Sequence, residues 1–350
     1  MFSKSVGRWL DASGPDSDIV LSTRIRLARN LAGLAFPGQA PAAEQDQVIQ
    51  RTELALQKLS VYAPDRFIAR SNLTPLKTSY LVERHLVSPD FALPARGSAQ
   101  HRAVFVGPDE TLSVMVNEED HLRLQILASG FDLSPALAEL QSFDAALGAE
   151  LGYAYSETLG FLTACPTNVG TGMRASVMIH LPGLVLTREI ERILRGALQV
   201  GLAVRGLFGE GTETKGNLFQ ISNQVALGKS EEEIVEELAK TTREVIGFER
   251  KARDYLLAHL RPEIEDKVFR AEAVLHSARL LNSSEVTNFL GLLRLGVATG
   301  LLAKPDLRLI NELLILGRPA NLQVYYDQEL SEAERDARRA ELVRARLLTA

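Results

Sequence analysis

The chain has 350 residues and a formal net charge of -5, and 46% of its residues are hydrophobic and 24% charged. These values are typical of a folded globular protein, and the length suggests two domains of roughly 150 residues each. The negative charge excludes a general attraction to nucleic acid or to an anionic membrane surface. The single cysteine, Cys165, excludes an internal disulfide and a zinc site built from several thiolates. No segment resembles a signal peptide or a membrane span, so we expect a cytoplasmic protein.

The part of the chain from Asp18 to about Gly228 has the pattern of an α+β domain. Apolar stretches of strand length alternate with Gly, Pro and Asn, and a helix is predicted over residues 42–59. The short connections favour antiparallel pairing. Strands are predicted over residues 19–27, 103–106, 112–117, 121–127, 174–180 and 218–222.

The rest of the chain is predicted to be mostly helical. Helix starts are indicated by polar caps, by capping boxes and by a proline in a first turn. These signals stand at Ser230 with Glu233, at Pro262, at Ser284, and at Ser331 with Glu334. We therefore expect one domain over residues 1–254 and a second, all-helical domain over residues 255–350.

The first segment with chemical potential is Ser-Thr-Arg-Ile-Arg, residues 22–26. On a strand, Ser22, Arg24 and Arg26 share one face, so two guanidinium groups point the same way. Guanidinium groups bind phosphate oxygens in a forked geometry, which favours a phosphate site. The alternative is a solvated strand face with ordinary ion pairs.

The second segment is Asn-Glu-Glu-Asp-His-Leu-Arg, residues 117–123. An extended conformation places Glu119, His121, Arg123 and Gln125 on one face and apolar residues on the other. A carboxylate and an arginine then reach the same surface. The alternative is that the acidic run is a charged turn.

The third segment, residues 165–176, begins Cys-Pro-Thr-Asn-Val-Gly-Thr-Gly. Its turn-forming residues predict a loop that can approach a ligand closely, with Arg174 at the start of the following strand. It matches neither the Walker phosphate loop nor the dinucleotide fingerprint. A lone cysteine such as Cys165 is more often a packed thiol than a reactive one.

The fourth segment, residues 205–216, has four glycines and the acidic residues Glu210 and Glu213. Such a loop is expected to be flexible and able to close over a substrate. The alternative is a glycine-rich hairpin whose acids are merely exposed.

Together the four segments, which are followed by Ile-Ser-Asn at residues 221–223, resemble the signatures of the phosphagen (guanidino) kinase superfamily and follow in the same order. The resemblance covers roughly residues 18–250. It implies an antiparallel β-sheet flanked by helices, the fold shared with glutamine-synthetase-like catalytic domains. It also implies phosphoryl transfer from ATP to a guanidinium nitrogen, with Mg²⁺ held mainly through the nucleotide phosphates.

Within that superfamily the chain is most similar to the bacterial protein-arginine kinases. The first motif begins at Ser22, which leaves no space for the helical N-terminal domain of the small-molecule enzymes, and Phe208 stands where those enzymes usually carry an additional arginine. The resemblance also implies a helical dimerisation domain with a phosphoarginine-binding motif at Arg335, Asp336, Arg339 and Ala340. On a helix, the first three of these fall within an arc of about 100°. The alternative is a solvated face of an arginine-rich helix.

The resemblance implies roles for individual residues. Glu119 is expected to be the general base, with Glu210 and Glu213 as further catalytic carboxylates and Cys165 beside the acceptor guanidinium. Which of Glu210 and Glu213 contacts the substrate is left open. The implied ATP-binding residues are Ser22, Thr23, Arg24, Ile25, Arg26, His85, Arg123, Arg174, Ala175, Ser176, Val177, Met178, Arg205, Gly206, Leu207, Phe208, Gly209 and Glu210.

The implied substrates are proteins with exposed arginines, and the implied partners are a zinc-binding activator, a stress-response repressor and a Clp-type protease. A homodimer is expected. Two other functions stay open at this point. One is a kinase of free arginine or another small guanidine, and the other is an inactive adaptor that binds phosphoarginine.

Overall fold

The computed structural model describes residues 2, 4–92, 99–206 and 215–349. The strands are β1 (Val20–Arg29), β2 (Phe67–Ala69), β3 (Ala103–Val106), β4 (Leu112–Val116), β5 (Leu122–Ser129), β6 (Tyr155–Ser156), β7 (Gly160–Phe161), β8 (Met173–His180), β9 (Leu202–Gly206) and β10 (Leu218–Asn223). The α-helices are α1 (Ala42–Gln57), α2 (Pro75–Glu83), α3 (Pro89–Ala92), α4 (Leu133–Leu151), α5 (Pro182–Leu186), α6 (Ile190–Gln199), α7 (Glu231–His259), α8 (Arg261–Ser277), α9 (Ser283–Ala298), α10 (Leu307–Leu316), α11 (Pro319–Tyr326) and α12 (Glu332–Leu348). Short 3-10 helices are η1 (Arg8–Leu10), η2 (Pro64–Arg66), η3 (Arg70–Asn72), η4 (Ala99–His101), η5 (Pro166–Asn168) and η6 (Lys215–Asn217).

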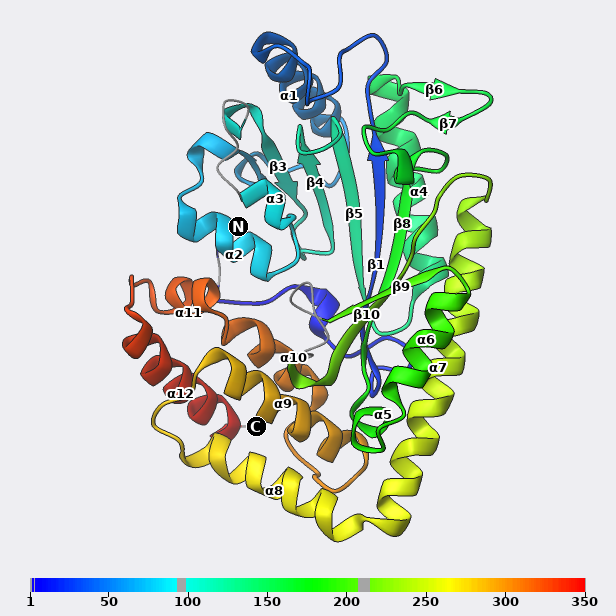
Figure 1. The fold of residues 1–350 in the computed structure, drawn as a ribbon. Helices are drawn as coiled ribbons and strands as arrows, with labels where there is room; N and C mark the ends of the chain where they lie inside the picture. The colour runs from blue at the N-terminus through cyan, green and yellow to red at the C-terminus, as the bar shows by residue number, and fades with distance from the viewer. Residues whose placement is uncertain (1, 3, 93–98, 207–214, 350) are drawn as a thin grey trace.

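Eight strands form one antiparallel sheet in the order β2-β3-β4-β5-β1-β8-β10-β9. Strand β1 runs through the middle of the molecule, between β5 and β8 (Figure 1). The other two strands, β6 and β7, form a separate hairpin. The expected α+β class with an antiparallel sheet is therefore confirmed.

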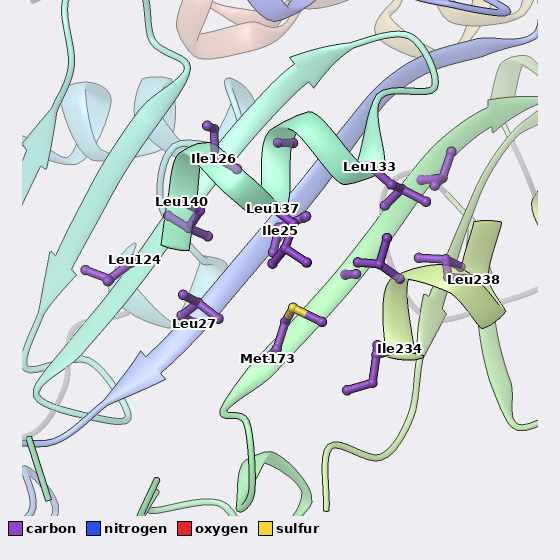
Figure 2. Close-up of a cluster of buried hydrophobic side chains, with 14 of the residues drawn as sticks. Ile25, Leu27, Leu124, Ile126, Leu133, Leu137, Leu140, Met173, Ile234 and Leu238 are labelled. Atoms are coloured by element: carbon purple, nitrogen blue, oxygen red, sulfur yellow. The ribbon is translucent and has the colours of Figure 1, made fainter. Parts of the chain in front are cut away.

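Alternation along the strands gives the sheet one apolar face. Ile25 and Leu27 of β1 are fully buried on this face, together with Leu124 and Ile126 of β5. Helices α4 and α7 cover it, and their leucine and isoleucine side chains meet those of the sheet in Figure 2. The opposite face of the central strands is left for polar side chains.

Helices α8 to α12 form a second body against one end of the sheet (Figure 1). They have their own apolar cluster, which also includes Leu21 of β1 and Leu218 of β10. Helix α7 continues past residue 254 without a break, from the sheet to α8. The two parts therefore share packed side chains, and a domain boundary near 254 stays a prediction.

The predicted strands are confirmed, each within two residues at either end, and the predicted helix over 42–59 is α1. The capping boxes at Ser230 and Ser331 are present, and Pro262 lies in the first turn of α8. The cap predicted at Ser284 is wrong by two positions. Asn282 caps α9, since its side chain accepts the main-chain N–H groups of Ser284 and Glu285. Across the described ranges, we find no helix both long and apolar enough to span a membrane.

Candidate active site

A cleft of about 480 Å³ lies over the polar face of the sheet. The strands β1, β4, β5, β8, β9 and β10 contribute to its floor. The loops before β5 and β8, the segment 82–89 and Arg318 contribute to its rim. It collects residues from all four segments that resemble the guanidino kinase signatures. These include Arg24, Arg26, Glu119, Arg123, Cys165, Arg174, Arg205 and Gly206, together with His85.

Strand register explains why the arginines meet. Arg26 of β1 lies directly opposite Arg174 of β8, and Arg24 lies opposite Ser176 two residues away. On the other side of β1, Arg123 of β5 lies opposite Ala28. Directly opposed residues of antiparallel strands share a face, so these guanidinium groups converge over the sheet. The sequence pattern of alternating arginines is thereby converted into a cationic cluster.

This cluster is costly in the absence of an anion. The pKa of Arg24 is lowered to about 10, first by burial and then by the nearby charges of Arg174 and Arg123. Burial and three neighbouring arginines also hold the pKa of Arg26 well below its usual range. The Nε atoms of Arg26 and Arg174 are buried and find no acceptor among the described residues. An anion with several oxygens would relieve both the repulsion and the unpaired donors.

Arg205 of β9 also lines the cleft and completes a cluster of five arginines with Arg24, Arg26, Arg123 and Arg174. Among the described residues, Arg123 is the one member of this five-arginine cluster that forms ion pairs with carboxylates. Its Nη1 lies 2.9 Å from Glu118, which is buried and also accepts a hydrogen bond of 2.7 Å from Ser88. Its Nη2 donates to Glu119, whose side chain is 41% exposed in the cleft. Glu118 therefore anchors the arginine, whereas Glu119 is accessible to a ligand.

A buried polar tie joins the turn that carries Glu119 to the loop that carries Cys165. The Oδ1 atom of Asp120 accepts hydrogen bonds of 2.6 Å from Asn30 Nδ2 and from the main-chain N–H of Ala164. Asn30 also accepts the N–H of His121 and donates to Leu162 O. Burial raises the pKa of Asp120, and these hydrogen bonds oppose that rise. The carboxylate and the thiol are thus delivered to the cleft by neighbouring backbone segments.

A narrow, mostly apolar recess of about 30 Å³ adjoins the cleft and shares Arg24, His85 and Gln220 with it. The remaining lining residues are Trp9, Leu10, Leu21, Ser22, Leu127, Ser176, Met178, Leu314 and Ile315. Ser22, Ser176 and Met178, predicted as nucleotide contacts, therefore lie here.

Several predicted nucleotide contacts do not face the cleft. The side chains of Thr23, Ile25, Ala175 and Val177 are fully buried on the core side of the sheet, because they alternate with the cleft-facing residues. The prediction that His121 shares the face of Glu119 and Arg123 is wrong. Strand β5 begins only at Leu122, and the preceding turn directs the His121 ring toward Leu31 N and Ala35 O.

Five predicted residues lie outside the described residues, namely Leu207, Phe208, Gly209, Glu210 and Glu213. Conversely, sequence reasoning missed Arg318, which lines the cleft although it belongs to the helical part of the chain. No local pattern pointed to it, because it reaches the cleft only through the packing of α11 against α2. In the part of the chain that the structure describes, no three His, Cys, Asp or Glu residues are grouped to hold a metal ion.

The C-terminal motif lies on α12. Arg339 is buried, and its guanidinium donates to Gly317 O, Leu281 O and Asp336 Oδ1, each at 2.6 Å. Arg335 is half-buried and donates to Leu330 O at 2.9 Å. Ala340 is fully buried in the apolar cluster of the helices. Arg339 thus ties α12 to its neighbours, and ligand binding by this motif stays a prediction.

A cationic cleft with a facing carboxylate is suited to moving a phosphoryl group. A family model described as "ATP:guanido phosphotransferase, C-terminal catalytic domain" matches residues 47–252, more than half of the chain. The solved structure of a lombricine kinase is similar with a TM-score of 0.60 and 28% identity, over 71% of this chain and 72% of that one. The fold and the cleft are therefore those of a guanidino phosphotransferase.

The curated relatives are more specific. The chain is 47% identical to a protein-arginine kinase of Symbiobacterium thermophilum, over 99% of this chain and 98% of that protein. It is also 47% identical to a protein-arginine kinase of Halalkalibacterium halodurans, over 99% and 96% of the two chains. A second family model, "Protein-arginine kinase McsB C-terminal domain", matches residues 261–350. The chain belongs to the protein-arginine kinase family.

Proposed function

We propose that the cleft transfers the γ-phosphoryl group of ATP to a guanidinium nitrogen of an arginine side chain in a protein substrate. One observation carries this proposal. The five arginines of the cluster and Glu119 line one cleft, in which two arginine Nε atoms are buried without an acceptor among the described residues. A triphosphate would satisfy the cations, and a substrate guanidinium would satisfy the carboxylate.

On the donor side, Arg24, Arg26, Arg123, Arg174 and Arg205 would hold the phosphate chain and stabilise the oxygens of the transferred group. The transition state is loose and carries charge on its equatorial oxygens, so converging guanidinium groups suit it. The adenine ring of ATP would lie toward the apolar recess, beside Arg24 and His85. That recess must widen to admit a purine.

On the acceptor side, the incoming arginine is a cation whose pKa exceeds about 12, so a proton must leave as the nitrogen attacks. Glu119 would bind this guanidinium and accept the proton. To do so it must release Arg123, which stays anchored by Glu118. Cys165 lines the same cleft, and its thiol lies 3.0 Å from Thr167 Oγ1. The acidic residues Glu210 and Glu213 of the glycine-rich loop remain further candidates.

Magnesium would be held mainly by the nucleotide. The donor set of the cleft fits this arrangement, since Glu118 is engaged by Arg123 and Ser88 and the described carboxylates do not group to hold a metal. Mg²⁺ bound to the phosphates would neutralise part of their charge. The arginines would then position the phosphate chain.

We further propose the finer properties that the resemblance implies. Residues 255–350 would dimerise and bind phosphoarginine through Arg335, Asp336 and Arg339. The modified proteins would be handed to a Clp-type protease during stress, and a repressor and a zinc-binding activator are the proposed partners. A cytoplasmic location likewise stays a prediction.

The decisive test replaces Glu119 by Gln. General-base catalysis contributes roughly 10²- to 10⁴-fold, so phosphoarginine formation should fall by that factor. Affinity for MgATP should change little, because the arginines remain. Phosphorus NMR at alkaline pH, which preserves the N–P bond, would follow transfer to a denatured protein and to free arginine.

Glu191→Gln is the matched control, since Glu191 is 82% exposed and pairs only with Arg195 among the described residues. It should transfer phosphate as the unaltered protein does. Normal transfer by Glu119→Gln would refute the base assignment. Preferential phosphorylation of free arginine would instead assign the enzyme to the small-molecule kinases.

A further inference from the structure

The helical part of the chain reaches the nucleotide side of the cleft. Among the described residues that line the cleft, Arg318 alone comes from beyond residue 228. Three to four residues earlier, Leu314 and Ile315 at the end of α10 line the adjoining recess. His85 lines both cavities and lies within reach of the charges of Arg24 and Arg318. Arg318 is therefore close to the part of the cleft that adjoins the recess, where the proposed function puts the nucleotide.

The backbone on both sides of Arg318 is fixed. Before it, Gly317 O accepts a hydrogen bond of 2.6 Å from Arg339 Nε of α12. After it, the carboxylate of Glu83 accepts the main-chain N–H groups of Ala320 and Asn321 at 2.9 to 3.0 Å. A carboxylate at the N-terminus of a helix is also favoured by the helix dipole. Arg318 is thus held between α12 and the end of α2.

Charges of both signs surround Arg318. Burial lowers the pKa of Arg318, Glu83 raises it, and the charge of Arg339 lowers it. Arg318 and Arg24 both act on His85, whose pKa is lowered to about 3, first by burial and then by these two cations. A further cation beside Arg24 and His85 raises the electrostatic energy of the empty cleft, and an anionic ligand would offset this cost.

On this basis, and resting on the proposed ATP-dependent activity, we propose that Arg318 is a sixth cationic contact to the nucleotide phosphates. It is supplied by the helical part of the chain. Arg339 acts as a positioning residue for it through Gly317. The helical part then completes the nucleotide site. A change at Arg339 of α12 reaches the nucleotide through Gly317 and its neighbour Arg318.

The first experiment measures the dissociation constants of MgATP and MgADP by titration calorimetry on the full chain. A charge-assisted hydrogen bond is worth roughly a 10- to 100-fold change in affinity, so Arg318→Ala should weaken binding by that factor. Arg318→Lys should recover part of it, because it keeps the charge and loses the fork. Arg270→Ala is the control, since Arg270 is 79% exposed on α8.

The alternative role for Arg318 is an ion pair with Glu83 that only joins the two parts of the chain. Arg318→Ala would then lower the melting temperature of the nucleotide-free protein and leave both dissociation constants unchanged. That result would overturn the proposal. A loss of affinity without a loss of melting temperature would support it.

A double-mutant cycle tests the positioning role of Arg339. Arg339→Gln should lower the affinity for MgATP when Arg318 is present. It should have no further effect on that affinity in the Arg318→Ala variant. Additive effects would refute the coupling. If Arg339→Gln does not fold, Glu83→Gln tests the same link from the other side, because it weakens the cap that holds α11.

These outcomes separate the inference from the proposed function. Unchanged MgATP affinity in Arg318→Ala, with transfer abolished in Glu119→Gln, counts against the inference alone. A wild-type chain that neither binds MgATP nor transfers phosphate counts against the proposed function.

Discussion

His85 shows how one residue is shaped by the site around it. It adopts a left-handed backbone conformation, with φ of 59°, two residues after the end of α2. Its carbonyl accepts a hydrogen bond of 2.7 Å from Gln125, and its ring meets the edge of the Trp9 ring. Burial and the cations of Arg24 and Arg318 lower its pKa from 6.5 to about 3. The ring is therefore neutral in the folded protein at physiological pH.

This shift predicts a pH dependence of stability. Below pH 6.5 the unfolded chain binds a proton at His85 that the folded chain rejects, so acidification lowers the free energy of unfolding. His85→Asn removes the titrating ring, and asparagine tolerates the left-handed conformation. Melting temperatures between about pH 7 and pH 5 should fall less steeply in the variant than in the unaltered protein. Parallel profiles would show that His85 titrates normally in the folded state.

At the scale of elements, the site depends on turns that are held by buried polar groups. The hairpin turn before β5 contains Asp120, and the loop before β8 contains Ala164, which is distant in the sequence. Asp120 nevertheless accepts a hydrogen bond from the N–H of Ala164, and a second one from the side chain of Asn30. Asp120 is only 1% exposed, so water competes little for its hydrogen bonds. It sets the relative positions of Glu119 and Cys165.

Asp120→Ala should therefore affect both stability and catalysis. It leaves the N–H of Ala164 buried without its acceptor, which costs about 1–3 kcal/mol. Asp120→Asn keeps the Oδ1 acceptor and is the matched control. Urea unfolding should show the loss in the alanine variant, and its turnover should fall while the asparagine variant retains most of both. Equal behaviour of the two variants would refute a positioning role.

At the scale of the whole molecule, the sheet and the helical part are joined by packed apolar and polar contacts. Ile315 and Ala320 share an apolar cluster with Trp9, Tyr80 and Leu127. Buried polar ties add to it, since Asn311 donates to Leu10 O at 3.1 Å and Arg84 donates to Asn321 at 2.7 Å. An interface of this kind favours unfolding as one unit.

We therefore expect one thermal transition, with calorimetric and van't Hoff enthalpies that agree. MgATP should raise the midpoint of that single transition, because it binds only the folded state. Differential scanning calorimetry of the full chain checks both points. Two separate transitions, of which only that of the sheet-containing part responds to MgATP, would show that the helical part does not belong to the nucleotide site.

The sequence alone determined what depends on local alternation and local capping. The strand pattern placed Arg24 and Arg26 on one face, and the caps at Ser230 and Ser331 located two helices, since these features depend on residues that are neighbours in the chain. Alternation failed at His121, where a turn and not a strand sets the direction of the ring. Only the tertiary structure decided that Glu118 anchors Arg123, that Asp120 joins two loops and that Arg318 reaches the cleft. Those contacts link segments far apart in the chain, and their geometry is set by packing that no local pattern encodes.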